Sequence, residues 1–217
     1  MQKFLTLIVF SIFVITANAQ FQKGNKVLGA GLNFQTSGTK ETSQTFTNFE
    51  SNSISLSLEM GFAKEANRLN GFYINSWYGK SKYEYSSQPS SNYSSENFGG
   101  GAGFFTKKYK SLGKGFFVYG EARGGFNYYK QNKSSNSNGD MLQYGVNIGV
   151  YPGLAYKWSD RFMLDLRFAD FASVGYSVRE NGFTSGGKNV ERNFSLSSSL
   201  GLGYLSNFGI GARFIIK

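Results

Sequence analysis

Apolar side chains recur at every second position over the last part of the chain, from Phe194 to Ile216. The even positions of this segment are almost all apolar, whereas its odd positions are mostly Ser and Gly. A period of two is typical of an extended strand with one apolar face and one small or polar face. The segment is about twice as long as the usual strand of a globular protein. A long strand with two unlike faces is expected where lipid contacts one face and a polar lumen contacts the other.

Eight segments of the chain alternate in this way. The expected strands are Val27–Gln35, Ser53–Ala63, Phe72–Tyr85, Phe98–Thr106, Phe116–Tyr129, Leu142–Tyr156, Arg161–Val178 and Phe194–Ile216. The third segment is the least regular, because Tyr73 and Trp77 fall on its otherwise polar face. The seventh loses its alternation near Asp170 and Phe171, where we expect a β-bulge.

The connections between these segments alternate between long and short. Residues 36–52, 86–97, 131–140 and 179–192 are long and polar, whereas residues 64–70, 107–115 and 157–160 are shorter and charged. Short periplasmic turns and long external loops are expected of an outer-membrane barrel. The sequence therefore predicts an all-β fold, an eight-stranded antiparallel up-and-down transmembrane β-barrel. A soluble exported β-sandwich adhesin is the alternative, because sandwich strands alternate too.

The first 19 residues have the features of a secretion signal. Lys3 precedes an apolar run from Phe4 to Ile15, and Ala17-Asn18-Ala19 matches a small-residue cleavage site. We therefore expect a signal peptide at residues 1–19 and a barrel domain at residues 20–217, placed in the bacterial outer membrane after export. The chain has no cysteine, so a disulfide framework is excluded.

Charged residues interrupt the small face of several segments. With the even residues facing outward, a set of six would point into the lower half of the lumen: Glu59, Glu121, Arg123, Asp165, Arg167 and Arg213. Three carboxylates and three guanidiniums form a neutral set, and buried charges are costly unless they are paired. Side chains just fill an eight-stranded barrel. We predict a structural ionic core, completed by Asn33, Asn127, Asn147 and Tyr119; a narrow aqueous path and catalytic carboxylates are the alternatives.

The composition removes most enzymatic chemistry. The chain has no histidine and no cysteine, so the usual nucleophilic triads and transition-metal ligand sets are absent. We expect no enzyme activity, no cofactor and no metal site. The formal net charge is +10, but no basic helix or nucleic-acid motif accompanies it, so nucleic acid is not an expected partner.

The densest basic run contains Lys107, Lys108, Lys110 and Lys114. We expect these residues to lie in one solvated turn. If the turn is instead a docking patch, anionic lipid head groups or periplasmic polymers are the expected partners.

Three stretches carry a resemblance to a known family. The Ala17-Asn18-Ala19-Gln20 junction, the glycine-rich stretch Val27–Leu32 and the closing stretch Phe208–Phe214 resemble small outer-membrane β-barrel proteins of the "porin family" of Bacteroidota. The chain is also similar in plan to the OmpA and OmpX barrels. The resemblance covers the whole mature chain and implies no catalytic or ligand-binding residue.

The expected function is a structural or surface-interaction role carried by the external loops. A narrow passive channel or transporter for small or apolar solutes is the alternative. The expected partners are outer-membrane lipid, lipopolysaccharide and, during insertion, the barrel-assembly machinery.

Overall fold

The fold is all-β in the part of the chain that the structure describes. The computed structural model describes residues 22–40, 48–84, 92–133, 140–182, 187–198 and 208–217. No helix within these ranges is long and apolar enough to cross a membrane. The signal peptide expected at residues 1–19 lies outside the described residues and stays a prediction.

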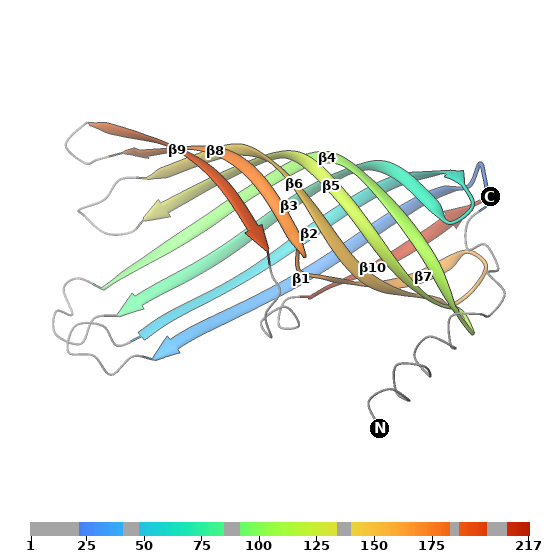
Figure 1. Cartoon of the computed structure of the whole chain (residues 1–217). Helices are drawn as coiled ribbons and strands as arrows, with labels where there is room; N and C mark the ends of the chain where they lie inside the picture. Colours follow the sequence, from blue (N-terminus) through green and yellow to red (C-terminus); the bar gives the residue numbers. More distant parts are fainter. Residues whose placement is uncertain (1–21, 41–47, 85–91, 134–139, 183–186, 199–207) are drawn as a thin grey trace, which may run out of the picture.

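The described residues form ten antiparallel strands that wind around a common axis (Figure 1). They are β1 (Lys26–Lys40), β2 (Asn48–Glu65), β3 (Arg68–Glu84), β4 (Tyr93–Gly113), β5 (Phe116–Lys133), β6 (Met141–Lys157), β7 (Phe162–Phe168), β8 (Ala172–Gly182), β9 (Lys188–Ser198) and β10 (Phe208–Ile216). Strands β1 to β6 each pair with the next strand along the chain.

Eight of the strands form a closed ring. β10 pairs with both β1 and β7, and β7 pairs with β6, so the ring runs from β1 through β6 to β7, β10 and back to β1. In the other half of the barrel, β8 lies beside β6 and β9 lies beside β8. One sheet closed on itself confirms the up-and-down barrel and excludes the two-sheet sandwich.

The count of ten strands differs from the expected eight because the last two segments are each divided. The seventh expected segment forms β7 and β8. The eighth contains the end of β9 and all of β10, and residues 199–207 between these two strands are not among the described residues. Val150 pairs with Ala172 and Gly153 pairs with Arg167, so two residues of β6 face four of the neighbouring segment. The bulge expected near Asp170 is therefore present. It lies beside Pro152, which has no backbone N–H to donate to a sheet ladder.

Tight turns gather at the end of the barrel where the C terminus lies, which we call the turn end (Figure 1). β2 and β3 are joined by Ala66 and Asn67, and Asn67 adopts the left-handed conformation, with φ of 61°. β4 and β5 are joined by Lys114 and Gly115, and residues 158–161 join β6 to β7. We call the opposite end of the barrel, where β1 ends and β2 begins, the loop end.

The strands extend further than the apolar pattern predicts. β4 runs to Gly113, and its ladder with β5 continues to the pair of Gly113 with Phe116. The expectation of one solvated turn for the basic run was therefore wrong, because Lys107, Lys108 and Lys110 lie within β4. Backbone hydrogen bonds do not require apolar side chains, so pairing continues past the end of the apolar band.

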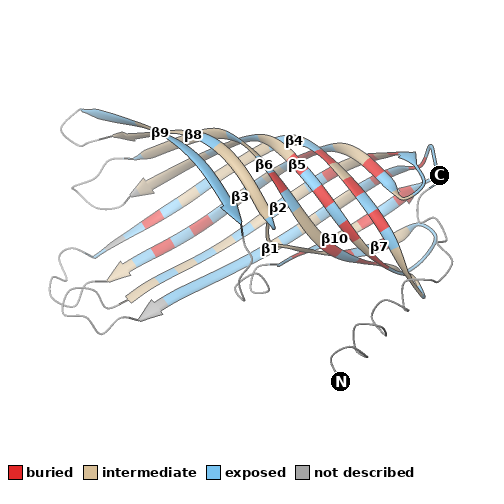
Figure 2. Cartoon of the chain, viewed as in Figure 1, coloured by how far each residue is buried: buried red, intermediate tan, exposed pale blue. Residues whose placement is uncertain are grey.

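The two faces of the sheet have opposite chemistry. Large apolar side chains at even positions form the outer surface, and Phe208 is 47% exposed there, whereas Arg213 on the same strand is 4% exposed. The irregular third segment is explained by its inward aromatic residues: Tyr73 is buried, and Trp77 stacks on Tyr129 at 4.9 Å between ring centroids. The buried positions concentrate in the half of the barrel near the C terminus (Figure 2).

Charge is distributed unevenly between the two ends. Among the described residues, the turn end has ten cationic side chains but only two acidic ones, Glu65 and Asp160. The cations are Lys23, Lys26, Lys64, Arg68, Lys108, Lys110, Lys114, Lys157, Arg161 and Lys217. The described residues at the loop end include eight cations and six carboxylates, several of them in ion pairs, such as Lys80 with Glu96 at 2.8 Å. Most of the net positive charge of the chain therefore lies at the turn end.

Candidate functional site

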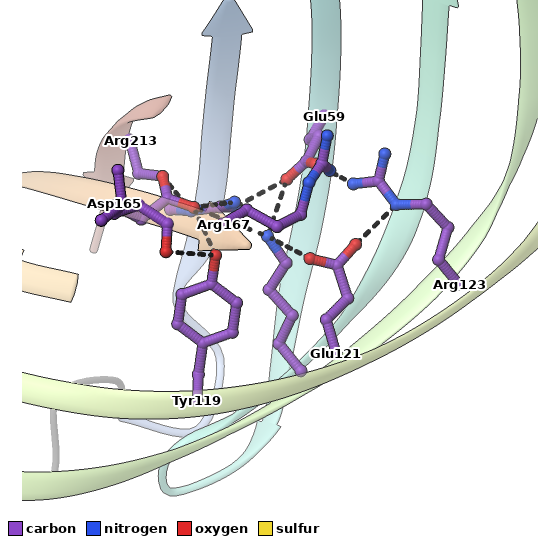
Figure 3. Close-up of polar contacts among 9 residues, drawn as sticks. Glu59, Tyr119, Glu121, Arg123, Asp165, Arg167 and Arg213 are labelled. Atoms are coloured by element: carbon purple, nitrogen blue, oxygen red, sulfur yellow. Dashed lines mark hydrogen bonds and ion pairs between the residues drawn. The ribbon is translucent and has the colours of Figure 1, made fainter. Parts of the chain in front are cut away.

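A cluster of charged side chains, all but one of them buried, fills the lumen near the turn end, and we call it the ionic plug. Its members are Glu59, Lys107, Glu121, Arg123, Asp165, Arg167 and Arg213, contributed by five strands around the ring. Each residue occupies an odd position of its strand, so alternation points its side chain inward. Figure 3 shows the labelled side chains converging from the surrounding strands.

Lys107 lies at the centre of the ionic plug. Its side chain is fully buried, and its Nζ lies 2.9 Å from Glu121 Oε2, 3.2 Å from Glu59 Oε2 and 3.9 Å from Asp165 Oδ2. The ammonium group also lies 5.2 Å from the centroid of the Phe105 ring and 5.3 Å from that of the Tyr119 ring. One lysine therefore joins all three carboxylates of the plug.

Glu59 contacts more cations than either of the other two carboxylates of the ionic plug. Arg123 Nη2 donates a hydrogen bond to its Oε1, and Arg213 Nη1 lies 2.8 Å from its Oε2. Arg167 Nη1 is more distant, at 3.8 Å from Oε1. Arg123 also donates from Nε to Glu121 Oε1 at 2.5 Å, so it bridges two carboxylates.

Asp165 and Arg213 form a bidentate pair across neighbouring strands. Arg213 Nε donates to Asp165 Oδ1 at 3.1 Å, and its Nη2 donates to Oδ2 at 3.0 Å. Tyr119 Oη donates to the same Oδ2 at 3.2 Å. Parallel donors on a planar guanidinium match a carboxylate well, so this pair fixes the position of both side chains.

Glycines leave the space that these side chains fill. A Cβ added to Gly153 would collide with the ring of Tyr119, and one added to Gly211 would collide with the carboxylate of Asp165. A Cβ added to Gly29 would approach Arg213 Nη1 within 3.3 Å. Glycine on the inner face thus allows large polar side chains to cross a narrow lumen.

The structure brings together the six residues expected in the lumen. Glu59, Glu121, Arg123, Asp165 and Arg213 are buried, and Arg167 lies at the loop-facing edge with 27% of its side chain exposed. The four expected supporting residues also lie in the lumen. Tyr119 donates a hydrogen bond to Asp165, and Asn127 Nδ2 donates one to Asn147 Oδ1 at 2.5 Å. Asn33 lines a small cavity.

Lys107 is the residue that sequence reasoning missed. Phe105, Lys107 and Tyr109 occupy successive odd positions and are all buried, whereas Lys108 and Lys110 are exposed at even positions. Continuing the alternation of the fourth segment beyond Thr106 would have found it. With Lys107 included, the ionic plug has four cations and three carboxylates, so it is not the neutral set that the sequence predicts.

The plug and the residues below it close the lumen. Leu69, Met163, Ile215 and Val27 are buried between the plug and the turn end. A cavity of about 30 Å³ lies beside Arg167, lined by Asn33, Ser57 and the plug residues, which is room for about two water molecules. Within the described residues, no group of three His, Cys, Asp or Glu side chains is arranged to hold a metal ion.

Comparisons with known proteins support the fold. No protein-family model and no curated protein matches the sequence. Among solved structures, the outer membrane protein OprG from Pseudomonas aeruginosa is similar at a TM-score of 0.51 with 12% identity, over 92% of this chain and 99% of that one. The outer membrane protein AlkL gives 0.46 with 15% identity, over 94% and 95% of the two chains. The N-terminal β-barrel domain of Pseudomonas aeruginosa OprF gives 0.38 with 15% identity, over 90% and 100%.

Proposed function

We propose that the protein is an integral β-barrel of the bacterial outer membrane that serves as a structural anchor for surface interactions at its loop end. The outer surface supports membrane insertion, because large apolar side chains such as Leu56, Ile148 and Ile210 cover it on neighbouring strands. Soluble monomers rarely expose an apolar surface of this extent. OprG, whose fold this chain shares, is itself an outer membrane protein.

The strand lengths also support this proposal. A tilted strand crosses the hydrocarbon core with about 9–11 residues. β2 has 18 residues and β4 has 21, so both extend beyond the apolar band at their ends. Tyr156 and Trp158 lie near the turn end with ring centroids 6.3 Å apart, and Trp158 is largely exposed, as expected for an interfacial aromatic belt.

The closed lumen is the observation that favours an anchor over an open pore. Lys107, Glu121, Leu69 and Met163 are fully buried across the interior, and the cavity beside Arg167 has room for only about two water molecules. Ions cannot pass through a packed layer of paired charges without breaking those pairs. The role of the protein then rests on the surface that the strands present at the loop end.

The chemistry of the chain supports a role without catalysis. Each carboxylate of the ionic plug contacts at least two cations, and the sequence contains no histidine or cysteine. In this proposal the partners are outer-membrane lipid, lipopolysaccharide and the barrel-assembly machinery during insertion, with no nucleic acid. A signal peptide at residues 1–19 and membership of the porin family of Bacteroidota belong to the same proposal.

Fractionation and gel mobility test the membrane location. We expect the protein in outer-membrane fractions, with an unheated band that migrates faster than the heated one because the folded barrel stays compact in detergent. Recovery of folded protein in the soluble fraction without detergent would contradict the proposal.

A narrow channel is the second candidate, and the polar upper lumen favours it. Asn127, Asn147, Gln143 and Arg179 line the interior above the plug, and Arg179 donates to Gln143 Oε1 at 3.2 Å. Planar-bilayer recording of the purified barrel separates the two candidates. The anchor proposal predicts no conductance steps, whereas a reproducible step that is lost on Arg167→Gln would establish the channel.

A further inference from the structure

Four of the ten cations of the turn end lie together on one outer face, formed by β2, β3 and β4. Lys64, Arg68, Lys108 and Lys110 are all exposed there, each at an even position of its strand. Their side chains therefore point away from the barrel axis, toward whatever surrounds the barrel. The nearest carboxylate, Glu65, is 3.7 Å from Arg68 Nη1 and cannot balance the group.

Two of these cations face each other directly. Arg68 and Lys108 are cross-strand partners in the ladder between β3 and β4. Residues in this position have Cβ atoms about 5 Å apart, and like charges there are destabilising. An anion between the two side chains would turn this repulsion into attraction.

An apolar groove lies on the same outer face, farther from the turn end than the paired cations Arg68 and Lys108. It has a volume of about 300 Å³ and is lined mainly by Phe62, Phe72, Phe104 and the aliphatic stem of Lys64. The Phe62 and Phe72 rings are 6.3 Å apart between centroids, and Phe104 is 75% exposed. Almost all of the surface that lines the groove is apolar.

A polar pair separates the cations from the groove. Thr106 Oγ1 donates to Asn70 Oδ1 at 2.7 Å, and these two residues are also cross-strand partners. Moving away from the turn end, the outer face of β3 therefore reads Arg68, Asn70, Phe72, and the polarity falls at each step. A glycerophospholipid has the same order of chemistry, with a phosphate, then ester groups, then acyl chains.

We propose that this face is a binding site for an anionic phospholipid of the leaflet at the turn end. The phosphate lies between Arg68 and Lys108, with Lys64 and Lys110 at its edges, and an acyl chain occupies the groove beside Phe104. The outward direction of the cations favours a lipid that surrounds the barrel over a soluble polyanion below it. This inference rests on the proposed membrane location.

Native mass spectrometry of the folded protein in detergent tests the site, with phosphatidylglycerol and phosphatidylcholine of identical chains as the probes. We expect the protein to retain phosphatidylglycerol preferentially. The double variant Arg68→Gln/Lys108→Gln should lose on the order of 30-fold in apparent affinity, because it removes two cations near an anionic head group. The variant should still fold, since it removes a repulsive pair from the surface.

The matched control is Lys114→Gln/Lys217→Gln, which removes two cations from the same end but not from this face. It should keep most of the affinity. Equal losses in both double variants, equal retention of the two lipids, or equally tight binding of soluble polyphosphate would each overturn the proposal. A protein that does not fold in detergent or insert into vesicles refutes the membrane location instead, so the two failures are distinguishable.

Discussion

Replacing Lys107 by methionine tests the ionic plug at its centre. Methionine keeps most of the length and volume of the side chain but removes the ammonium group that contacts Glu59, Glu121 and Asp165. After the change, Glu121 keeps only its pair with Arg123. The three carboxylates and three arginines that remain are formally neutral as a set. The variant therefore tests whether a neutral set is enough to keep the barrel stable or whether a central cation is needed.

The distances set the size of the effect. At an effective dielectric constant of about 20, a pair separated by the 2.9 Å between Lys107 and Glu121 attracts by about 6 kcal/mol. Desolvation of the buried ions and repulsion between Lys107 and the nearby arginines offset much of this attraction. Removing one partner of a buried ion pair costs about 3–5 kcal/mol, and here Glu59, Glu121 and Asp165 each lose one of their cations. We expect Lys107→Met to lower the free energy of unfolding by that amount.

Urea unfolding in detergent micelles, followed by loss of the fast-migrating gel band, measures this free energy. Lys108→Met is the matched control, because Lys108 is the next residue along β4 and is exposed on the outer face. It should leave the free energy of unfolding unchanged or raise it by no more than about 0.5 kcal/mol, because Lys108 repels its cross-strand partner Arg68. If Lys107→Met is as stable as the control, or more stable than the natural protein, the central role of the lysine is refuted.

Three further substitutions or titrations give separate checks. Asp165→Asn should lower the free energy of unfolding by about 3 kcal/mol, because a neutral amide cannot balance the guanidinium that it faces; unchanged urea unfolding would contradict this. Gly153→Val should displace the Tyr119 ring and also destabilise the barrel, which the same urea titration would detect. At the turn end, a hydrogen bond from Lys157 lowers the pKa of Asp160 below its ordinary value of 3.8. The resulting stabilisation is present above the ordinary pKa and is lost as the pH falls through the lowered one. Lys157→Met should raise the NMR-measured pKa of Asp160 toward its ordinary value, although the charge of Lys217 still lowers it.

The sequence predicts the barrel because its period of two is repeated in eight segments. That period assigns Glu59 and Arg213 to the lumen and Phe208 to the outside, and the structure places them there. The even number of segments predicts that the ring closes, and the loss of alternation predicts the bulge near Asp170.

Other features depend on pairing between strands, and the run of apolar residues alone does not reveal them. The apolar pattern of the fourth segment ends at Thr106, but backbone pairing continues, so Lys107 enters the lumen while its neighbours face outward. Charge alone suggests a solvated turn at this place. The pairing of Arg68 with Lys108 likewise follows from the register of β3 and β4, which the sequence of either strand does not specify.

Spin labelling of β2 tests most directly whether the even-numbered apolar side chains face lipid and the odd-numbered side chains face the lumen. The chain has no native cysteine, so single cysteines can be placed at Ile54, Ser55, Leu56, Ser57 and Leu58 in turn without background labelling. In vesicles, the account predicts that labels at the even positions collide with membrane-dissolved oxygen, whereas labels at the two serine positions are protected from it. Oxygen access at the serine positions, or water exposure at all five, would contradict the account.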